Sequence, residues 1–209
     1  MAVSAVDVVR FVTDYAAVVH EHRQELIDLD SAIGDADHGE NLDRGFRAAV
    51  ERLPDPAGAT PGEVLKAVAT ALISKVGGAA GPLYGTAFLR AATAVEGQAE
   101  LDGAAVLAAL DAAVGGVQQR GRSEVGDKTM LDALVPAVEA VRAGLDGGGS
   151  LGDALAAAAD AASQGAEDTV PIVARKGRAS YLGERSAGHK DPGGASTALL
   201  FATLARTCP

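Results

Sequence analysis

Hydrophobic side chains recur at three- and four-residue steps from the beginning of the chain almost to its end. The first run begins near Ser4 and includes Val8, Val12, Tyr15, Val19, His22, Leu26 and Leu29. Ser4 and Asp7 are three residues apart, which is the spacing of a capping box at a helix N-terminus. Because steps of three and four place side chains on one face of a helix, we predict an amphipathic helix through Leu29.

The same periodicity, together with capping residues, predicts seven further helices. Thr60 to Glu63 combines a cap, a proline at the first helical position and a glutamate at the third. Asp102 caps another helix, with Leu101 and Val106 placed as a hydrophobic staple. The seven cover about Asn41–Leu53, Thr60–Lys75, Pro82–Glu96, a segment from Asp102, Lys128–Leu145 with a bend at Pro136, a segment from Ser150, and Ala195–Arg206.

These elements predict an all-α fold. The pattern contains no convincing strand, and a composition of 48% hydrophobic but only 3% aromatic residues favours closely packed helices. Since the connections are mostly short, we expect an up-and-down bundle of antiparallel amphipathic helices, in a single domain over residues 1–209.

Net charge, the length of uncharged runs and the cysteine count limit the partners and the cellular compartment that we expect. The chain carries 18 basic and 28 acidic residues, or −10, which argues against nucleic acid or an anionic membrane as its partner. The longest uncharged runs have 14 residues, whereas a membrane span needs roughly 17–25. Cys208 is the single cysteine, so we expect no disulfide and interpret it as a thiol near a frayed terminus. Without a basic leader, the chain is expected to be cytoplasmic.

Acidic residues crowd into the connection between the first two predicted helices. Asp30, Asp35 and Asp37 follow the spacing D-x4-D-x-D, and nothing basic occurs after them until Arg44. Carboxylates on a tight loop can converge on a hard cation, and Gly34 allows the backbone to turn sharply. The spacing therefore predicts a metal site, with a solvated acidic connection as the alternative.

The identity of the cation can be narrowed by the spacing. An EF-hand loop that began at Asp35 would need Asp or Asn at its fifth position and glutamate at its twelfth. Those positions hold Gly39 and Phe46, which excludes an EF-hand. Magnesium fits better, because it takes few protein carboxylates and completes its coordination with water and phosphate oxygens.

Other features indicate an anionic ligand. Asn41 stands at the start of a predicted helix, where free N–H groups and the helix dipole favour a phosphate. The long connection 174–194 carries a charge of 5 − 2 = +3 over residues 175–194, which indicates an anion unless these charges are only solvated. His38, beside the acids, could position a phosphate or serve as a hydrogen-bonded structural group.

Two glycine-rich stretches are weaker signals. Residues 77–82 join two predicted helices with small side chains that leave room for a ligand close to the backbone. Residues 121–129 contain Gly126-Asp127-Lys128-Thr129, which is not a P-loop, because Asp127 interrupts the required G-K-[ST] and no strand precedes it. We expect Lys128 and Thr129 to open a helix instead.

Four blocks together resemble the nucleotide-binding L subunits of the dihydroxyacetone kinase family, over essentially the whole chain. The blocks are GDADHG (34–39), GGAAGPLYG (77–85), GDKTMLDAL (126–134) and ARKGRASYLGERSAGHKDPGG (174–194). The first and the last of them are the specific ones. The resemblance implies a barrel of eight antiparallel amphipathic helices, with the nucleotide held in the loops at one end.

The resemblance also implies the ligands of the site. Asp30, Asp35 and Asp37 match aspartates that hold two Mg²⁺ ions between the nucleotide phosphates, and no protein nucleophile is implied. Ala80 stands where a serine is common, so no hydroxyl contact is implied there, and Glu40 would act through its backbone. The positions that match nucleotide contacts are His38, Gly39, Glu40, Asn41, Gly78, Ala79, Gly121, Met130, Arg178, Asp191, Pro192 and Gly193.

The implied activity is a phosphoryl relay. The chain is too short to include the family's dihydroxyacetone-binding K domain, so we expect an L subunit that meets a separate K subunit. In one type, ADP stays bound and is recharged by a phosphohistidine protein of the phosphotransferase system, and the length favours this type. The alternatives are an ATP-dependent kinase subunit for dihydroxyacetone or another small ketose, and a nucleotide-loaded regulatory module. The oligomeric state stays open, a homodimer included.

Overall fold

The computed structural model describes residues 2–75 and 77–208, and within them the chain is all-α. No strand occurs in these ranges, and the one β-bridge joins Val3 to Leu101. The helices are α1 (Ala5–Glu21), α2 (Arg23–Ile33), α3 (His38–Val50), α4 (Pro61–Lys75), α5 (Ala80–Ala94), α6 (Gly103–Gly121), α7 (Leu131–Asp146), α8 (Leu151–Asp168), the 3-10 segment η1 (Arg178–Ser186) and α9 (Pro192–Thr207).

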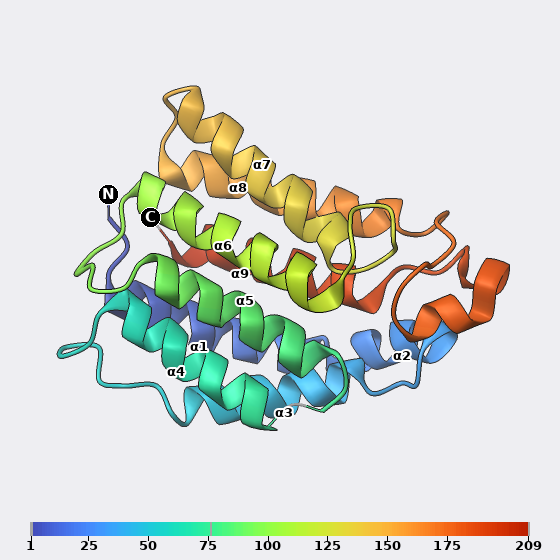
Figure 1. Cartoon of the computed structure of the whole chain (residues 1–209). Helices are drawn as coiled ribbons and strands as arrows, with labels where there is room; N and C mark the ends of the chain where they lie inside the picture. Colours follow the sequence, from blue (N-terminus) through green and yellow to red (C-terminus); the bar gives the residue numbers. More distant parts are fainter. Residues whose placement is uncertain (1, 76, 209) are drawn as a thin grey trace.

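Eight of these helices close into a ring. Each of α3 to α8 packs against the next helix in the chain, η1 aside, and α1 packs against both α3 and α9. Figure 1 shows the long helices lying side by side, with both termini at one end and the α2–η1 region at the other. The implied barrel of eight helices is therefore confirmed, with α2 and η1 added at one end.

The core is built mainly from small aliphatic side chains around one aromatic group. The ring of Phe46 lies edge-on to Tyr15, Tyr84 and Phe88, at centroid distances of 4.7, 6.1 and 6.0 Å. Such edge-to-face pairs add to the stability gained from burial alone. An apolar cavity of about 120 Å³ remains beside them. None of the helices in the described ranges is long and apolar enough to cross a membrane.

The predicted caps are present. Ser4 Oγ accepts from the N–H of Asp7 at 3.3 Å, and Asp7 Oδ2 accepts from the N–H of Ser4 at 2.9 Å. Thr60 and Glu63 form the same reciprocal pair at the start of α4. Asp102 accepts from the N–H of Ala105 at 2.8 Å and so caps α6.

Three predicted features of the helices were wrong in detail. The first helix is interrupted at His22, which has ψ of 8°, and continues as α2 to Ile33. The helix predicted from Lys128 begins at Leu131, because Lys128 has φ of 63° and cannot be helical. Cys208 is not frayed but 8% exposed, and its N–H donates to the Leu204 carbonyl at 3.0 Å.

Other predicted helix starts lie too late in the chain. The helices predicted from Asn41, Pro82 and Ala195 begin two or three residues earlier, at the starts of α3, α5 and α9. For α9 the reason is Asp191, which accepts from the N–H of Gly194 at 2.6 Å and places Pro192 at the first helical position. The long connection predicted over 174–194 contains η1.

Candidate metal and phosphate site

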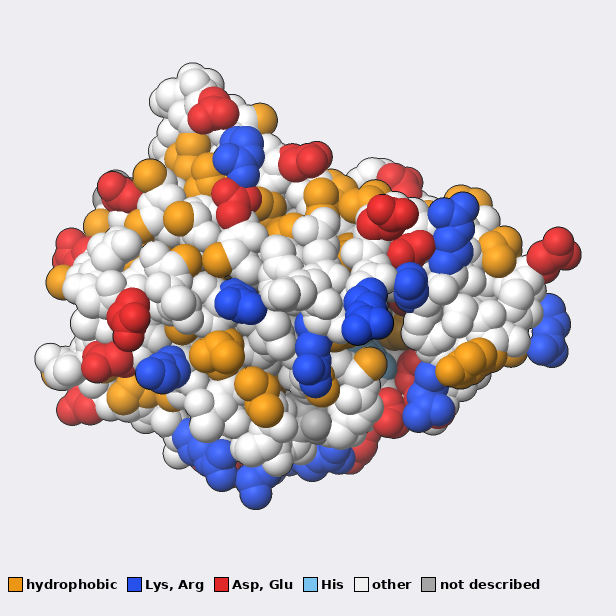
Figure 2. Space-filling model, viewed as in Figure 1, with side chains coloured by type: hydrophobic (Ala, Val, Ile, Leu, Met, Phe, Trp, Pro, Cys, Tyr) orange, Lys and Arg blue, Asp and Glu red, His pale blue; other side chains and the backbone are white. Residues whose placement is uncertain are grey.

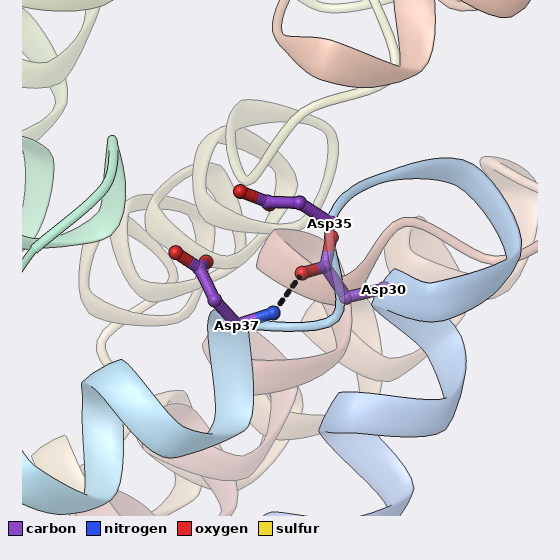
Figure 3. A group of neighbouring side chains, drawn as sticks. All are labelled: Asp30, Asp35 and Asp37. Carbon is purple, nitrogen blue, oxygen red and sulfur yellow. Dashed lines mark hydrogen bonds between the residues drawn. The ribbon is translucent and has the colours of Figure 1, made fainter.

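Three carboxylates meet where α2 turns into α3. Asp30 lies in the last turn of α2, and Asp35 and Asp37 follow on the connection. One oxygen of each lies within 4.8 Å of the others, and Figure 3 shows the three side chains gathered around the turn. The predicted convergence is therefore present in the structure.

Main-chain groups fix the geometry of this turn. Asp30 Oδ2 accepts from the N–H groups of Asp37 at 2.8 Å and His38 at 3.1 Å, the first of which is drawn in Figure 3. A Cβ on Gly34 would lie 2.0 Å from Asp30 Oδ1, so this position excludes any side chain. Ala36 has φ of 62°, a left-handed conformation that turns Asp35 and Asp37 to the same side.

The charge of the cluster is only partly compensated within the chain. Burial raises the pKa of Asp30, and the nearby Asp35 and Asp37 raise it further, against the two N–H donors. Arg178 pairs with Asp35 at 2.9 Å. Carboxylate oxygens on a tight turn with few protein ligands fit a hard divalent cation such as Mg²⁺, which would complete its shell with water and phosphate.

The cluster forms one wall of a cavity of about 160 Å³ at the α2–η1 end of the barrel. Loops from four helix pairs enclose it: α2–α3, α4–α5, α6–α7 and α8–α9. Figure 2 shows a hollow near this end with lysine and arginine side chains around it. The predicted residues that line it are Asp30, Asp35, Asp37, His38, Gly78, Ala79, Met130, Arg178, Asp191, Pro192 and Gly193.

Four predicted contact residues lie behind this lining. Gly39 packs against α2, since a Cβ there would meet the Arg23 carbonyl at 2.2 Å. Glu40 is exposed and pairs with Arg23 on the outer surface. Gly121 borders the cavity through Leu83, a lining residue that a Cβ on Gly121 would approach to 3.4 Å.

Asn41 is the fourth, and it supports an anionic ligand. Its Nδ2 is buried and has no hydrogen-bond partner among the described residues. A Cβ on Gly78 would lie 3.2 Å from this nitrogen and 3.5 Å from the Asp37 carboxylate oxygens. A buried N–H donor without a partner is costly, and a phosphate oxygen near the Gly78 turn would satisfy it.

The ring of His38 faces the bundle rather than the cluster. Its Nε2 lies 2.9 Å from Ser196 Oγ, which in turn bonds the hydroxyl of Tyr84 at 2.8 Å. Desolvation lowers the pKa of His38 to about 4, against the effects of Asp37 and the Pro192 carbonyl. A neutral, hydrogen-bonded ring matches the structural alternative, and a nucleotide contact by His38 stays a prediction.

The basic segment is anchored, so that Arg178 reaches the cluster. Ala179 of η1 packs with Ile33 at the end of α2 in a small apolar group. Ser186 Oγ accepts from the Ala174 N–H at 2.8 Å and donates to the Gly183 carbonyl at 2.6 Å. These contacts hold the segment over the end of the barrel, and they leave the guanidinium of Arg178 largely exposed at the mouth.

The N-terminus of α9 also lines the cavity. Its N-cap Asp191 is 8% exposed, and burial raises the pKa of its carboxyl to about 7. The repulsion from Asp132 adds to this shift, while the N–H of Gly194 and the charge of Lys128 oppose it. Free N–H groups at a helix N-terminus attract an anion.

Several lining residues were missed by sequence reasoning. Tyr84, Thr129 and Lys176 line the cavity, and Tyr84 and Met130 also line the apolar cavity of the core. Lys128 lines it too, but its side chain points inward. Tyr84, Lys128, Thr129 and Lys176 all lie within the blocks that carry the family resemblance, and only that location could have indicated them.

The chemistry of these residues fits a polyphosphate and divalent cations. The cavity is lined by carboxylate oxygens, by the N-terminus of α9 and by the basic residues Lys176 and Arg178. The single cysteine is packed into the apolar core and lines no part of this cavity. Transfer of a group between two bound molecules requires no protein nucleophile here.

Comparisons with known proteins agree with this description. The family model for the DAK2 domain matches residues 32–206. The chain is 43% identical over 205 residues to the "PEP-dependent dihydroxyacetone kinase, ADP-binding subunit DhaL" of Escherichia coli, covering 98% of each chain. It is 40% identical over 188 residues to the "PTS-dependent dihydroxyacetone kinase, ADP-binding subunit DhaL" of Lactococcus lactis, covering 89% of this chain and 88% of that one.

Two solved structures of the dihydroxyacetone kinase of C. freundii share the fold. The native form aligns with a TM-score of 0.72 and 26% identity over 95% of this chain and 34% of that one. The complex with AMP-PNP and Mg²⁺ aligns with a TM-score of 0.71 and 27% identity over 95% of this chain and 33% of that one. The chain belongs to the DAK2-domain family.

Proposed function

We propose that this chain is the ADP-binding subunit of a phosphoenolpyruvate-dependent dihydroxyacetone kinase. The observation that carries the proposal is the convergence of Asp30, Asp35 and Asp37 within 4.8 Å, inside a cavity that also holds Arg178 and the N-terminus of α9. Full-length similarity to ADP-binding subunits of such kinases supports it. The substrate dihydroxyacetone would be carried by a separate K subunit.

Each wall of the cavity then has a defined role. Asp30, oriented by two main-chain N–H groups, would hold two Mg²⁺ ions together with Asp35 and Asp37. Magnesium bound there would neutralise the phosphate charge that develops during phosphoryl transfer. The N-terminus of α9 would donate hydrogen bonds to phosphate oxygens, and Asn41 Nδ2 would gain the acceptor that it lacks among the described residues.

Arg178 changes its partner in this mechanism. In the structure its guanidinium pairs with Asp35. With a cation held by Asp35, the guanidinium would be free to donate to a phosphoryl group at the mouth, because its planar fork matches phosphate oxygens. The residue thus stands between the nucleotide and whichever partner protein docks at this end.

The source of the phosphoryl group is proposed to be a phosphohistidine protein of the phosphotransferase system. Loops from four helix pairs enclose the site, so release of a magnesium-bound nucleotide should be slow. Slow release suits ADP that is recharged in place, and it would limit an enzyme that needs a new ATP in every cycle. If the nucleotide exchanged rapidly instead, the chain would be the subunit of an ATP-dependent kinase.

The experiment follows labelled ADP through many turnovers. Protein purified in magnesium should retain about one ADP per chain through desalting and lose it to a chelator. Radiolabelled ADP loaded beforehand should stay bound while the phosphohistidine donor and the K subunit turn over. Rapid exchange of the label with unlabelled ATP, with turnover on ATP alone, would reject the relay and support the ATP-dependent alternative.

A further inference from the structure

Among the described residues, Lys128 is the one lysine or arginine that is buried. Its side chain is 1% exposed, whereas the other lysines and arginines in residues 2–75 and 77–208 are not buried. Its Nζ donates to the carbonyls of Thr169 at 2.7 Å and Ile172 at 3.1 Å, and also to that of His189. A fourth carbonyl, that of Val170, lies at 3.5 Å. An ammonium group is costly to bury unless hydrogen bonds replace its water, so these carbonyls are what permit its position.

The backbone around Lys128 holds the side chain inward. Its φ of 63° lies in the left-handed region, which a side-chain-bearing residue rarely adopts. Asp132 accepts from the N–H of Gly126 at 2.6 Å and from that of Thr129 at 2.7 Å, one on each side of the lysine. Such a strained conformation persists only where its surroundings determine it, as they do here.

The carbonyl groups that Lys128 binds are connected to the N-terminus of α9, which lines the cavity. Thr169 Oγ1 accepts from the N–H of Asp191, the N-cap of α9, at 2.9 Å. The Val170 carbonyl accepts from the N–H of Gly188 at 2.7 Å. The turn after α8 and the segment before α9 are therefore joined to each other, and the ammonium group of Lys128 binds both.

The same loop also meets the basic segment. The Asp127 carbonyl accepts from the N–H of Arg175 at 3.0 Å, three residues before Arg178. Lys128 thus lies where two connections of the site meet: α6–α7 and α8–α9, the latter at both of its ends. Its Nζ is already bonded to main-chain carbonyls, so it does not act as a phosphate-binding lysine.

We propose that Lys128 is a positioning residue for the nucleotide site. Its ammonium group holds the turn of residues 169–172 and His189 together, and so fixes the N-terminus of α9, which lines the cavity. The proposal rests on the proposed function, because it assigns a role within the same site. It predicts that loss of the ammonium group loosens this wall locally and weakens nucleotide binding by the folded protein.

The test compares Lys128→Met with Lys190→Met by amide hydrogen exchange and by calorimetric titration with Mg-ADP. Lys190 is the matched control, since it lies in the same segment but pairs on the surface with Glu167. In Lys128→Met, the N–H groups of Gly188 and Asp191 should exchange at least about tenfold faster while those of α3 and α4 keep their protection. The Kd for Mg-ADP should rise about 10–100-fold, as for other supporting residues of a metal site. Lys190→Met should change neither quantity.

Three outcomes would contradict the proposal. A folded Lys128→Met variant with normal Mg-ADP affinity would remove the positioning role, as would exchange that accelerates evenly over the whole barrel. If Lys128→Met does not fold, the wild-type protein labelled with ¹⁵N-lysine decides the point, because a Lys128 ammonium that exchanges as fast as surface lysines overturns the proposal. Failure of the wild-type protein to bind Mg-ADP at all would instead overturn the proposed function, and the exchange results would still report on the network.

Discussion

Asp191 combines two roles that have opposite effects on stability. As the N-cap of α9 it accepts from the N–H of Gly194, which stabilises the helix. As a buried acid beside Asp132, it has a pKa raised from 3.8 to about 7. The folded state therefore binds a proton that the unfolded state releases at lower pH, and ionisation of Asp191 destabilises the fold.

This gives a pH-dependent prediction for Asp191→Asn. Between about pH 4 and pH 7, the contribution of Asp191 to the free energy of unfolding should fall as pH rises, and above pH 7 the destabilisation is complete. Asparagine is also a good N-cap and does not ionise. The variant should therefore be more stable than wild type above pH 7 and show a flatter profile between pH 4 and 7. Urea unfolding across this range, without magnesium or nucleotide, measures the difference, and parallel profiles would contradict the prediction.

Among single residues, those that act through local spacing could be predicted and those that act through distant partners could not. Asp30, Asp35 and Asp37 lie within one turn of chain, so their spacing alone brought their oxygens together. Lys128 was expected to open a helix. Its burial depends on carbonyls of residues 169, 172 and 189, and no pattern near the lysine indicates them.

At the scale of the helices, close approach at glycine sets the packing. Gly165 on α8 faces α7, and a Cβ there would lie 2.2 Å from the Asp132 carbonyl oxygen. A Cβ on Gly115 of α6 would meet no atom of a neighbouring element within 4 Å. Both glycines lie inside helices. Replacing Gly165 by alanine tests the packing between α7 and α8, whereas replacing Gly115 tests the preference of the backbone for the helix.

Gly165→Ala should destabilise the fold by about 1–3 kcal/mol, because α7 and α8 must separate to admit the methyl group. Gly115→Ala should stabilise it by about 0.5–1 kcal/mol, because alanine favours the helix and meets nothing. Since Asp132 also holds the loop around Lys128, only Gly165→Ala should weaken Mg-ADP binding as well. Urea unfolding and calorimetry of both variants check this, and equal effects of the two would contradict it.

The helices themselves could largely be predicted from the sequence, but not all of their ends. Starts at Ser4, Thr60 and Asp102 were found because a side chain three residues from its partner caps each one. The start of α9 was placed too late, because Asp191 belongs to a segment whose charges and glycines resemble a loop. The interruption at His22 leaves the hydrophobic period unchanged, so no pattern marked it.

At the scale of the whole molecule, the barrel places its site at one end and leaves the other end to the termini (Figure 1). Periodicity predicted antiparallel helices, but the closure of the ring depends on α1 meeting both α3 and α9. That contact joins the two ends of the chain, and only the family resemblance implied it. Closure brings four connections around one cavity, so a ligand there bridges helices that are distant in sequence.

A ligand that bridges these connections should stabilise the whole barrel when magnesium is present. A compound that binds only the folded state adds about 2.7 kcal/mol at a concentration of 100 times its Kd. For a domain of this size, that corresponds to a rise in Tm of about 5–10 °C. We therefore expect Mg-ADP to produce this rise, and a chelator to abolish it.

The Tm of Asp37→Asn, measured with and without Mg-ADP, distinguishes an effect on the metal site from an effect on the stability of the fold. Asp37 makes no side-chain cap at the start of α3, and its loss removes repulsion within the cluster, so the ligand-free variant should melt at or above the wild-type temperature. Its rise in Tm with Mg-ADP should be lost, because magnesium loses one of its few protein ligands. Asp28→Asn, at an exposed acid on α2 whose carboxylate accepts from Gln24, should keep the full rise. A full rise in Asp37→Asn, or in chelator, would mean that the nucleotide binds without the metal cluster and would reject its assignment.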